Sequence, residues 1–169
     1  IQSAIIPDIK EFSSNFSDSF VCYLPKDIVS GDFYWLSAIG EKVFFAVIDC
    51  TGHGVPGGFM CMLGSSLLSE IVNERNVSSP SRVLDQLREK IMGSLHQTGQ
   101  SGESQDGMDM VFCALDKKTM KLSYSSAYNS FYLIRKNELI ESEVNKMPVG
   151  YHHKMGAFKE FEMQLQKGD

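Results

Sequence analysis

The pattern of apolar positions predicts strands in the first third of the chain. Three runs rich in β-branched and aromatic residues indicate strands at Phe20–Leu24, Gly31–Leu36 and Val43–Asp49. The first two runs are separated by the turn-forming sequence Pro25-Lys26-Asp27. The third run is almost continuously apolar, which is typical of a strand that is buried on both faces.

The period changes to that of a helix after the glycine-rich stretch Gly52–Gly58. Apolar side chains then recur at helical spacing up to about Val72, which predicts a helix with Pro56 in its first turn. A second helix is expected to begin at Ser79-Pro80, because a capping residue followed by proline is a helix-start signal. We expect the two helices to form a hairpin.

The remainder of the chain returns to strand patterns. The segment Gln97–Gly107 holds no large apolar side chain and is predicted to be a loop. Strands are then expected at Met108–Leu115, Met120–Ser125, Phe131–Arg135 and Leu139–Glu143, followed by a half-buried strand around Phe161–Leu165. Strands, a helical hairpin and further antiparallel strands together predict an α+β fold in which sheet packs against helices.

The two ends of the chain indicate a piece of a longer protein. Residues Ile1–Asp18 mix apolar positions with Pro7, which predicts the end of an upstream helix or linker. Residues 19–169 fit one domain. The chain begins with Ile1 and stops at Gly168-Asp169, directly after a strand pattern, so we expect further sequence on both sides.

The composition excludes several classes of protein. Of the 169 residues 43% are hydrophobic, which is enough to build a packed core and excludes intrinsic disorder. The net charge of −5 and the absence of a basic cluster argue against nucleic acid as a partner. The longest apolar runs are far shorter than the roughly 20 residues of a membrane-spanning helix. The four cysteines are widely spaced, so we expect reduced, buried thiols and a cytoplasmic location.

Two acidic residues are candidates for metal binding because both lie beside predicted strands. Asp32 occurs in the sequence Val-Ser-Gly-Asp, and Asp49 closes the third predicted strand. The stretch that follows, Cys50–Gly54, is flexible enough to bring main-chain oxygens close to a ligand. Oxygen donors are preferred by Mg²⁺ and Mn²⁺. A second interpretation stays open, in which Asp49 caps the helix near Pro56 and the glycines only form its turn.

Other polar residues near this stretch have alternative roles. His53 lies between Gly52 and Gly54 and is suited to proton transfer or to orienting a water molecule, but a purely structural turn histidine fits equally well. Asp109 lies at the entry to a strand, where it approaches a metal or caps a turn. The spacing Gly52-x-Gly54-x-x-Gly57 formally matches a dinucleotide-binding fingerprint, but a second helix follows in place of a parallel strand, which argues against it.

At these motifs the sequence resembles the SpoIIE/RsbU-type serine phosphatases of the bacterial PPM (PP2C-like) class. The resemblance extends over essentially the whole chain and is carried by VSGDFYW, FFAVIDCTGHGVPGGFMCMLGSSLLSEIV, DGMDMVFCALD, LSYSSAYNSFYLIR and KMPVG. It implies a PP2C-like sandwich of two antiparallel β-sheets flanked by α-helices, incomplete at the C-terminus. It also implies two Mn²⁺ or Mg²⁺ ions at one end of the sandwich.

The resemblance also implies the roles of individual residues. Asp32, Asp49 and the main-chain carbonyl of Cys50 match the metal ligands of the family, with Asp49 as the bridging ligand. Asp49 and His53 are then the catalytic residues, and Gly52, Gly54 and Asp109 are additional candidates for the site. The implied reaction is hydrolysis of phosphoserine by a metal-bridged water, without a phosphoenzyme.

The expected biology follows from the same resemblance. The substrate would be a phosphorylated STAS-type anti-sigma-factor antagonist, and an upstream sensor or receiver domain would regulate the enzyme. A homodimer and membrane tethering of the parent protein through an upstream region are compatible with it. Family members carry further metal carboxylates in motifs beyond the final Gly-Asp, which here is Gly168-Asp169. A non-catalytic pseudo-phosphatase or regulatory binding module is therefore the alternative.

Overall fold

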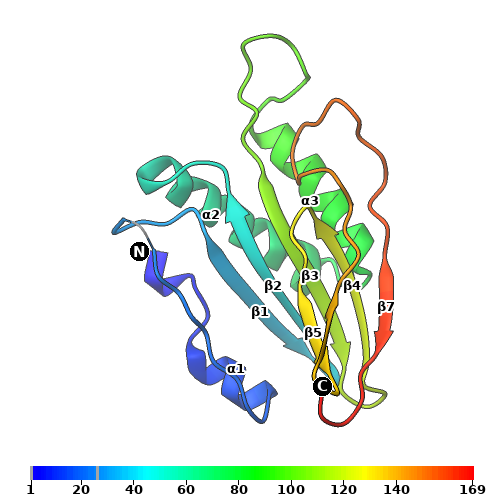
Figure 1. The fold of residues 1–169 in the computed structure, drawn as a ribbon. Coiled ribbons are helices and arrows are strands. Elements are labelled where there is room, and N and C mark those ends of the chain that lie inside the picture. The colour runs from blue at the N-terminus through cyan, green and yellow to red at the C-terminus, as the bar shows by residue number, and fades with distance from the viewer. Residues whose placement is uncertain (1, 26) are drawn as a thin grey trace.

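Five antiparallel strands form the main sheet of the protein, in the order β1-β2-β3-β4-β7 (Figure 1). The computed structural model describes residues 2–25 and 27–169. The strands are β1 (Phe33–Ile39), β2 (Lys42–Cys50), β3 (Met108–Asp116), β4 (Lys121–Ala127) and β7 (Phe161–Gln164). All four neighbouring pairs in this sheet are antiparallel, which excludes the parallel unit of a dinucleotide-binding fold. The strands predicted after Ser125 do not continue this sheet in sequence order, because β4 pairs with β7 and the two strands between them form a separate sheet.

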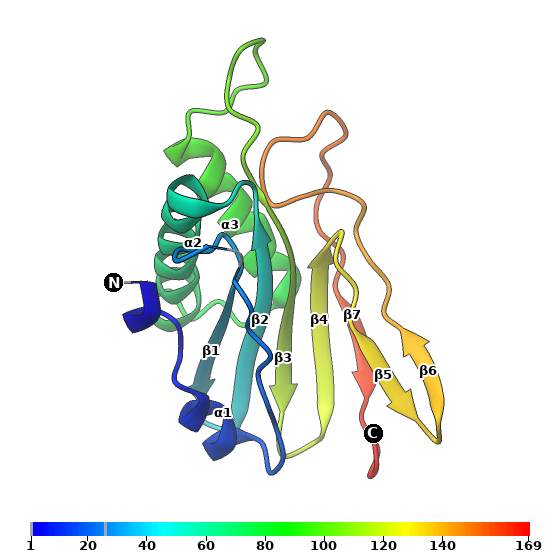
Figure 2. The same ribbon diagram turned by 60° about the vertical axis from the view of Figure 1, so that its left-hand side comes forward.

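The predicted helical hairpin is present and covers one face of the main sheet (Figure 2). Helix α2 (Gly54–Ser69) continues into a π-helical segment, η2 (Glu70–Glu74), and helix α3 (Pro80–Ser94) follows. Helix α3 turns an apolar stripe inward, and its four largest contributions to the core are fully buried: Val83, Leu84, Leu87 and Ile91. These side chains pack with the inward-facing residues of β1, β2 and β3 in the larger hydrophobic core.

Small residues of α2 face the sheet. A Cβ on Gly64 would lie only 2.6 Å from the Met108 side chain, so glycine lets helix and sheet meet. The segment Gly54–Glu74 is long and apolar enough to cross a membrane by length and composition alone. Half of its most apolar window is buried inside the fold, as is usual for the core helix of a soluble domain.

The face of the main sheet turned away from α2 and α3, here called the outer face, is less well covered. A smaller cluster of buried side chains lies on it, formed by Val111, Cys113, Leu115, Leu122 and Tyr124. The prediction that the third strand is buried on both faces is wrong, because Val47 of β2 is 60% exposed. Side chains alternate between the faces of a strand, and only the inward set of β2 meets the helices.

The remaining elements flank the main sheet (Figure 2). A second antiparallel sheet consists of the hairpin β5 (Tyr132–Arg135) and β6 (Glu138–Glu141), which lies beside β4 and β7. Near the N-terminus, η1 (Gln2–Ala4) and α1 (Ile9–Asn15) are short helices, and α1 begins with a capping box made by Asp8 and Glu11. The α+β prediction with antiparallel sheets and flanking helices is confirmed.

Three predictions about particular segments need correction. No strand forms at Phe20–Leu24, and this segment takes no part in either sheet. Cys22 is exposed, although the other three cysteines are buried and all four are free thiols as expected. Met62, an apolar residue of the predicted helix that became α2, is 39% exposed, so this apolar position does not enter the core. Ile1 and Lys26, which belong to the predicted N-terminal helix and turn, lie outside the described residues.

Candidate metal centre

The strand register brings three carboxylates to one edge of the main sheet. Phe33 of β1 pairs with Ile48 of β2, so Asp32 lies at the position next to Asp49. Asp49 in turn pairs directly with Asp109 of β3. Three segments far apart in sequence therefore each place an acidic side chain at the same end of adjacent strands. Asp109 lies within β3, where it pairs with Asp49, and its role at a metal stays a prediction.

Two of the carboxylates at this edge of the sheet have raised pKa values. Burial raises the pKa of Asp32 above its ordinary value, and the negative charge of Asp49 raises it further. The pKa of Asp109 is raised for the same two reasons, in the same order. Both shifts indicate that the ionised forms lack a compensating positive charge, which is the environment that a bound cation neutralises.

The donor atoms present fit a hard divalent cation. Besides the carboxylates, the carbonyl oxygen of Cys50 faces the segment that carries Asp32, since a Cβ on Gly31 would lie 3.2 Å from it. The Cys50 thiol is buried, which raises its pKa, so it stays protonated and is unsuited as a ligand. Among the described residues, no three His, Cys, Asp or Glu side chains are grouped tightly enough to enclose one ion.

Glycines allow the two loops of this edge to pack backbone against backbone. A Cβ on Gly31 would lie 2.6 Å from the carbonyl oxygen of Gly52, and one on Gly57 would lie 2.7 Å from the same atom. Neither space admits a side chain, so the segment before β1 is held directly against the start of α2. Gly52 and Gly54, predicted as additional site residues, have φ values of +88° and +62° and form the turn between β2 and α2.

Hydrogen bonds fix the segments that carry Asp32 and Asp109. The Asp32 amide donates to the Ser30 hydroxyl at 3.0 Å, and the Tyr23 hydroxyl donates to the Asp32 carbonyl at 3.1 Å. On the other side, Thr51 Oγ1 accepts from the Gly107 amide at 3.0 Å, and the Thr51 amide donates to the Gly107 carbonyl at 2.9 Å. The entry to β3 is thereby tied to the end of β2.

His53 lies at the start of α2. It occupies the N-cap position with an extended backbone, but its side chain makes no capping hydrogen bond. Its Nδ1 atom lies 3.2 Å from Oδ2 of Asp27. Asp27 was interpreted from the sequence only as a turn residue, and no spacing rule connects it with a histidine 26 positions later.

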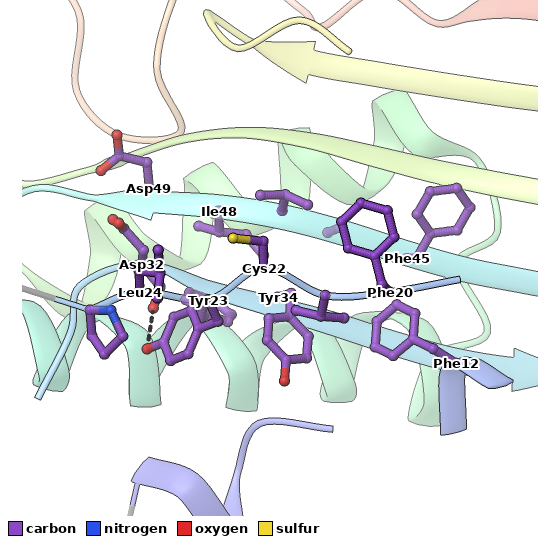
Figure 3. Close-up of a pocket in the computed structure, with 15 residues that line it drawn as sticks. Phe12, Phe20, Cys22, Tyr23, Leu24, Asp32, Tyr34, Phe45, Ile48 and Asp49 are labelled. Carbon is purple, nitrogen blue, oxygen red and sulfur yellow. Dashed lines mark hydrogen bonds between the residues drawn. The ribbon is translucent and has the colours of Figure 1, made fainter. Parts of the chain in front are cut away.

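A pocket of about 400 Å³ opens on the outer face directly beside the two carboxylates (Figure 3). The segment between α1 and β1 forms one wall and strands β1 and β2 form the other. Figure 3 shows Asp32 and Asp49 at one end of this pocket and the rings of Phe12, Phe20 and Phe45 at the other. The acidic edge of the sheet therefore continues into an apolar hollow.

The other polar candidates do not join the carboxylates. Asp106 Oδ2 accepts a hydrogen bond from the Ser104 hydroxyl, and the Asp106 amide donates to the same hydroxyl at 3.1 Å. The rings of His152 and His153 are in contact at a tilt of 49°, with centroids 4.2 Å apart, and His152 Nε2 lies 3.4 Å from the Tyr128 hydroxyl. Met60, Met108 and Met110 are core residues.

Comparisons with known proteins point to one family. Residues 39–169 match the family described as Stage II sporulation protein E (SpoIIE). No curated protein matches the chain. The SiaA-PP2C domain of Pseudomonas aeruginosa is similar in structure, with a TM-score of 0.83 and 25% identity over 98% of this chain. The chain spans 63% of that domain.

Two further solved structures share the fold. The RsbU and RsbW domains of a Mycobacterium tuberculosis protein match 85% of this chain and 38% of theirs, with a TM-score of 0.63 and 18% identity. RsbX in complex with magnesium matches 85% of this chain and 64% of its own, with a TM-score of 0.58 and 14% identity. At these identities the likeness concerns the fold alone.

Proposed function

The chain belongs to the SpoIIE family of PP2C-like phosphatase domains, and on this basis we propose that it is a metal-dependent serine/threonine protein phosphatase domain of a bacterial signalling protein. The observation that carries the proposal is the alignment of Asp32, Asp49 and Asp109 on three adjacent strand ends. Carboxylates assembled in this way are costly for a fold unless a cation neutralises them.

The cofactors of this proposal are two Mn²⁺ or Mg²⁺ ions. Asp32, Asp49 and the Cys50 carbonyl would hold them, with Asp49 as the shared ligand and Asp109 as an additional one. When bound, such ions lower the pKa of water and neutralise phosphoryl oxygens during in-line attack. The magnesium complex of RsbX, which shares this fold, supports the choice of a hard cation.

The residues of the chain have distinct tasks in this reaction. Asp32 and Asp49 would hold the cations at the strand ends, and the charge of these cations would help to place the phosphoryl group. His53 supplies a proton from Nε2 to the leaving serine oxygen as the phosphorus–oxygen bond breaks, so that serine leaves as an alcohol. Water provides the new oxygen of inorganic phosphate, and its own proton passes to solvent.

A protein carrying phosphoserine is the proposed substrate. The family resemblance supports a STAS-type anti-sigma-factor antagonist, and the structural likeness to an RsbU–RsbW protein is in keeping with such a signalling context. In this proposal residues 19–169 form the phosphatase domain, residues 1–18 connect it to an upstream sensor or receiver domain, and the reaction takes place in the cytoplasm. A homodimer of the parent protein and its tethering to the membrane through that upstream region are both part of this proposal.

The direct test is phosphate release from a phosphoserine protein by this chain in Mn²⁺. We expect turnover that requires the metal and is abolished in Asp49→Asn. Asp18→Asn, which neutralises an exposed carboxylate outside the site, serves as the matched control and should retain full activity. Metal-independent turnover, or turnover that survives Asp49→Asn, would contradict the assignment of Asp49.

A non-catalytic binding module is the second candidate, because the described residues contain no cluster of three tightly grouped side-chain ligands. This candidate predicts partner binding that is unaffected by Asp49→Asn and no phosphate release at any Mn²⁺ concentration. A partner complex that forms only with metal would rule it out.

A further inference from the structure

Asp27 lies outside the carboxylate row, but its side chain contacts the one histidine of the site. The Oδ2 atom of Asp27 is 3.2 Å from Nδ1 of His53, and both side chains are partly open to solvent. The two residues come from different loops, one before β1 and the other between β2 and α2. Their contact is therefore a product of the tertiary fold.

Three features of the structure direct His53 toward Asp27. The His53 side chain leaves the helix end uncapped, although N-cap residues ordinarily bond to the first turn. The Asp27 carboxylate lies over the start of α2, where a Cβ on Gly54 would be 3.8 Å from Oδ2. A carboxylate at this end of a helix is favoured by the helix dipole.

The position of Asp27 is set by the same packing that sets Asp32. Val29, two residues after Asp27, contacts α2 so closely that a Cβ on Gly58 would overlap its side chain. Gly31 and Gly57 meet backbone to backbone in the same interface. One segment, residues 27–32, therefore carries the partner of His53 at its beginning and a metal carboxylate at its end.

We propose that Asp27 is a positioning residue for His53: by accepting a hydrogen bond from Nδ1–H it fixes the imidazole ring and leaves Nε2 directed to the reaction. A histidine exchanges a proton through one nitrogen efficiently when the other is held by an acceptor. The ring acts as an acid in its doubly protonated form: Nε2–H passes its proton to the leaving serine oxygen, the neutral ring that remains keeps Nδ1–H on Asp27, and solvent restores the proton on Nε2. The role in turnover rests on the proposed phosphatase function, whereas the hydrogen bond does not.

The expected effect is modest because the pair is exposed. The side chains of His53 and Asp27 are 70% and 46% accessible to solvent. An exposed pair of this kind changes an equilibrium by up to about fivefold, which corresponds to about 1 kcal/mol. Removal of Asp27 should therefore weaken the preference for the Nδ1–H form of the ring by a factor of that order.

Nuclear magnetic resonance of the metal-free chain tests the hydrogen bond directly. Long-range proton–nitrogen correlation spectra of the His53 ring show which nitrogen carries the proton in wild type, Asp27→Ala, Asp27→Glu and the matched control Asp18→Ala. We expect Asp27→Ala to shift the ring away from the Nδ1–H form, Asp27→Glu to restore it, and Asp18→Ala to leave it unchanged. An equal tautomer ratio in wild type and Asp27→Ala would overturn the proposal.

Turnover of two substrates tests whether the contact serves proton transfer. A phosphoserine peptide has an alkoxide leaving group that needs a proton, whereas nitrophenyl phosphate releases a stable anion without one. Asp27→Ala should lower kcat for the peptide about fivefold and leave kcat for nitrophenyl phosphate unchanged. Equal losses on both substrates would show a general structural effect and refute the positioning role. Inactivity of the wild-type chain on both would refute the phosphatase function of this chain, while the spectra would still decide the hydrogen bond.

Discussion

Replacing Asp49 with asparagine should stabilise the metal-free protein and at the same time abolish its response to metal. Asp49 lies between Asp32 and Asp109 on adjacent strands, so it has a like-charged neighbour on each side. Like charges placed opposite each other across strands each cost about 0.2–1 kcal/mol. Asp49→Asn removes both repulsions and keeps the shape of the side chain.

The net gain in the free energy of unfolding should be about 1 kcal/mol without metal, since the site is partly open to solvent. For a domain of this size such a gain raises Tm by about 2–4 °C. A cation that binds only the folded protein stabilises it in proportion to the logarithm of its concentration over Kd. Wild type should therefore gain stability on addition of Mn²⁺, and the variant should gain little.

Differential scanning calorimetry of both proteins, with and without Mn²⁺, measures the two effects together. The expected result is a crossing: the variant melts above wild type without metal and below it at saturating metal. Asp18→Asn should change neither value. A lower Tm of metal-free Asp49→Asn would mean that Asp49 makes a favourable contact in the fold, and an undiminished metal response would place the cation elsewhere.

Two further predictions concern the scaffold around the site. Gly57→Ala should destabilise the protein by about 1–3 kcal/mol in chemical denaturation, because the new Cβ would lie 2.7 Å from the Gly52 carbonyl oxygen. Gly93→Ala in α3 is the comparison: its Cβ would meet nothing within 4 Å, so it should stabilise the protein by about 0.5–1 kcal/mol. Equal effects of the two substitutions would refute the close backbone packing. A hydrogen bond from Arg135 lowers the pKa of Asp169 from its ordinary value of 3.8 to about 2. The ion pair therefore contributes its full stabilisation of the folded protein above pH 3.8, and this contribution is lost as the pH falls to about 2. In an acid titration, Arg135→Gln should be less stable than wild type at neutral pH, and the difference in stability should disappear near pH 2. A difference that persists at that pH would contradict the role of this ion pair.

The sequence was sufficient to predict the main elements of the fold, because their periodicity reflects which side chains meet the core. Helix α3 is an example, since each of its inward residues recurs at helical spacing and is fully buried. For β2 the apolar run indicated burial on both faces, yet Val47 is exposed. The sequence shows that a side chain is apolar, but whether another element packs over it depends on the arrangement of the whole fold.

The segment Phe20–Leu24 shows a related limit. Its residues have high strand propensity, but in the described chain the segment pairs with no strand and lies across a pocket from β1 and β2. The segment instead forms a wall of the pocket beside Asp32 and Asp49. Propensity within a few residues could not reveal this arrangement.

The candidate site was predictable to the extent that its residues belong to compact motifs. Asp32 and Asp49 stood out beside predicted strands, and the register later placed Asp109 next to them. Asp27 could not be found in this way, because its relation to His53 arises from two loops that meet only through glycine packing. Contacts between loops leave no periodic signal in the sequence.

The most direct test of the metal centre is to add substoichiometric Mn²⁺ to the isotopically labelled chain and record which amide resonances broaden. A paramagnetic ion broadens nearby nuclei most strongly, so the affected residues locate it. We predict the strongest broadening at Asp32, Asp49 and Asp109, and its disappearance in Asp49→Asn. Broadening centred on His152 and His153, or a pattern unchanged by Asp49→Asn, would contradict the account.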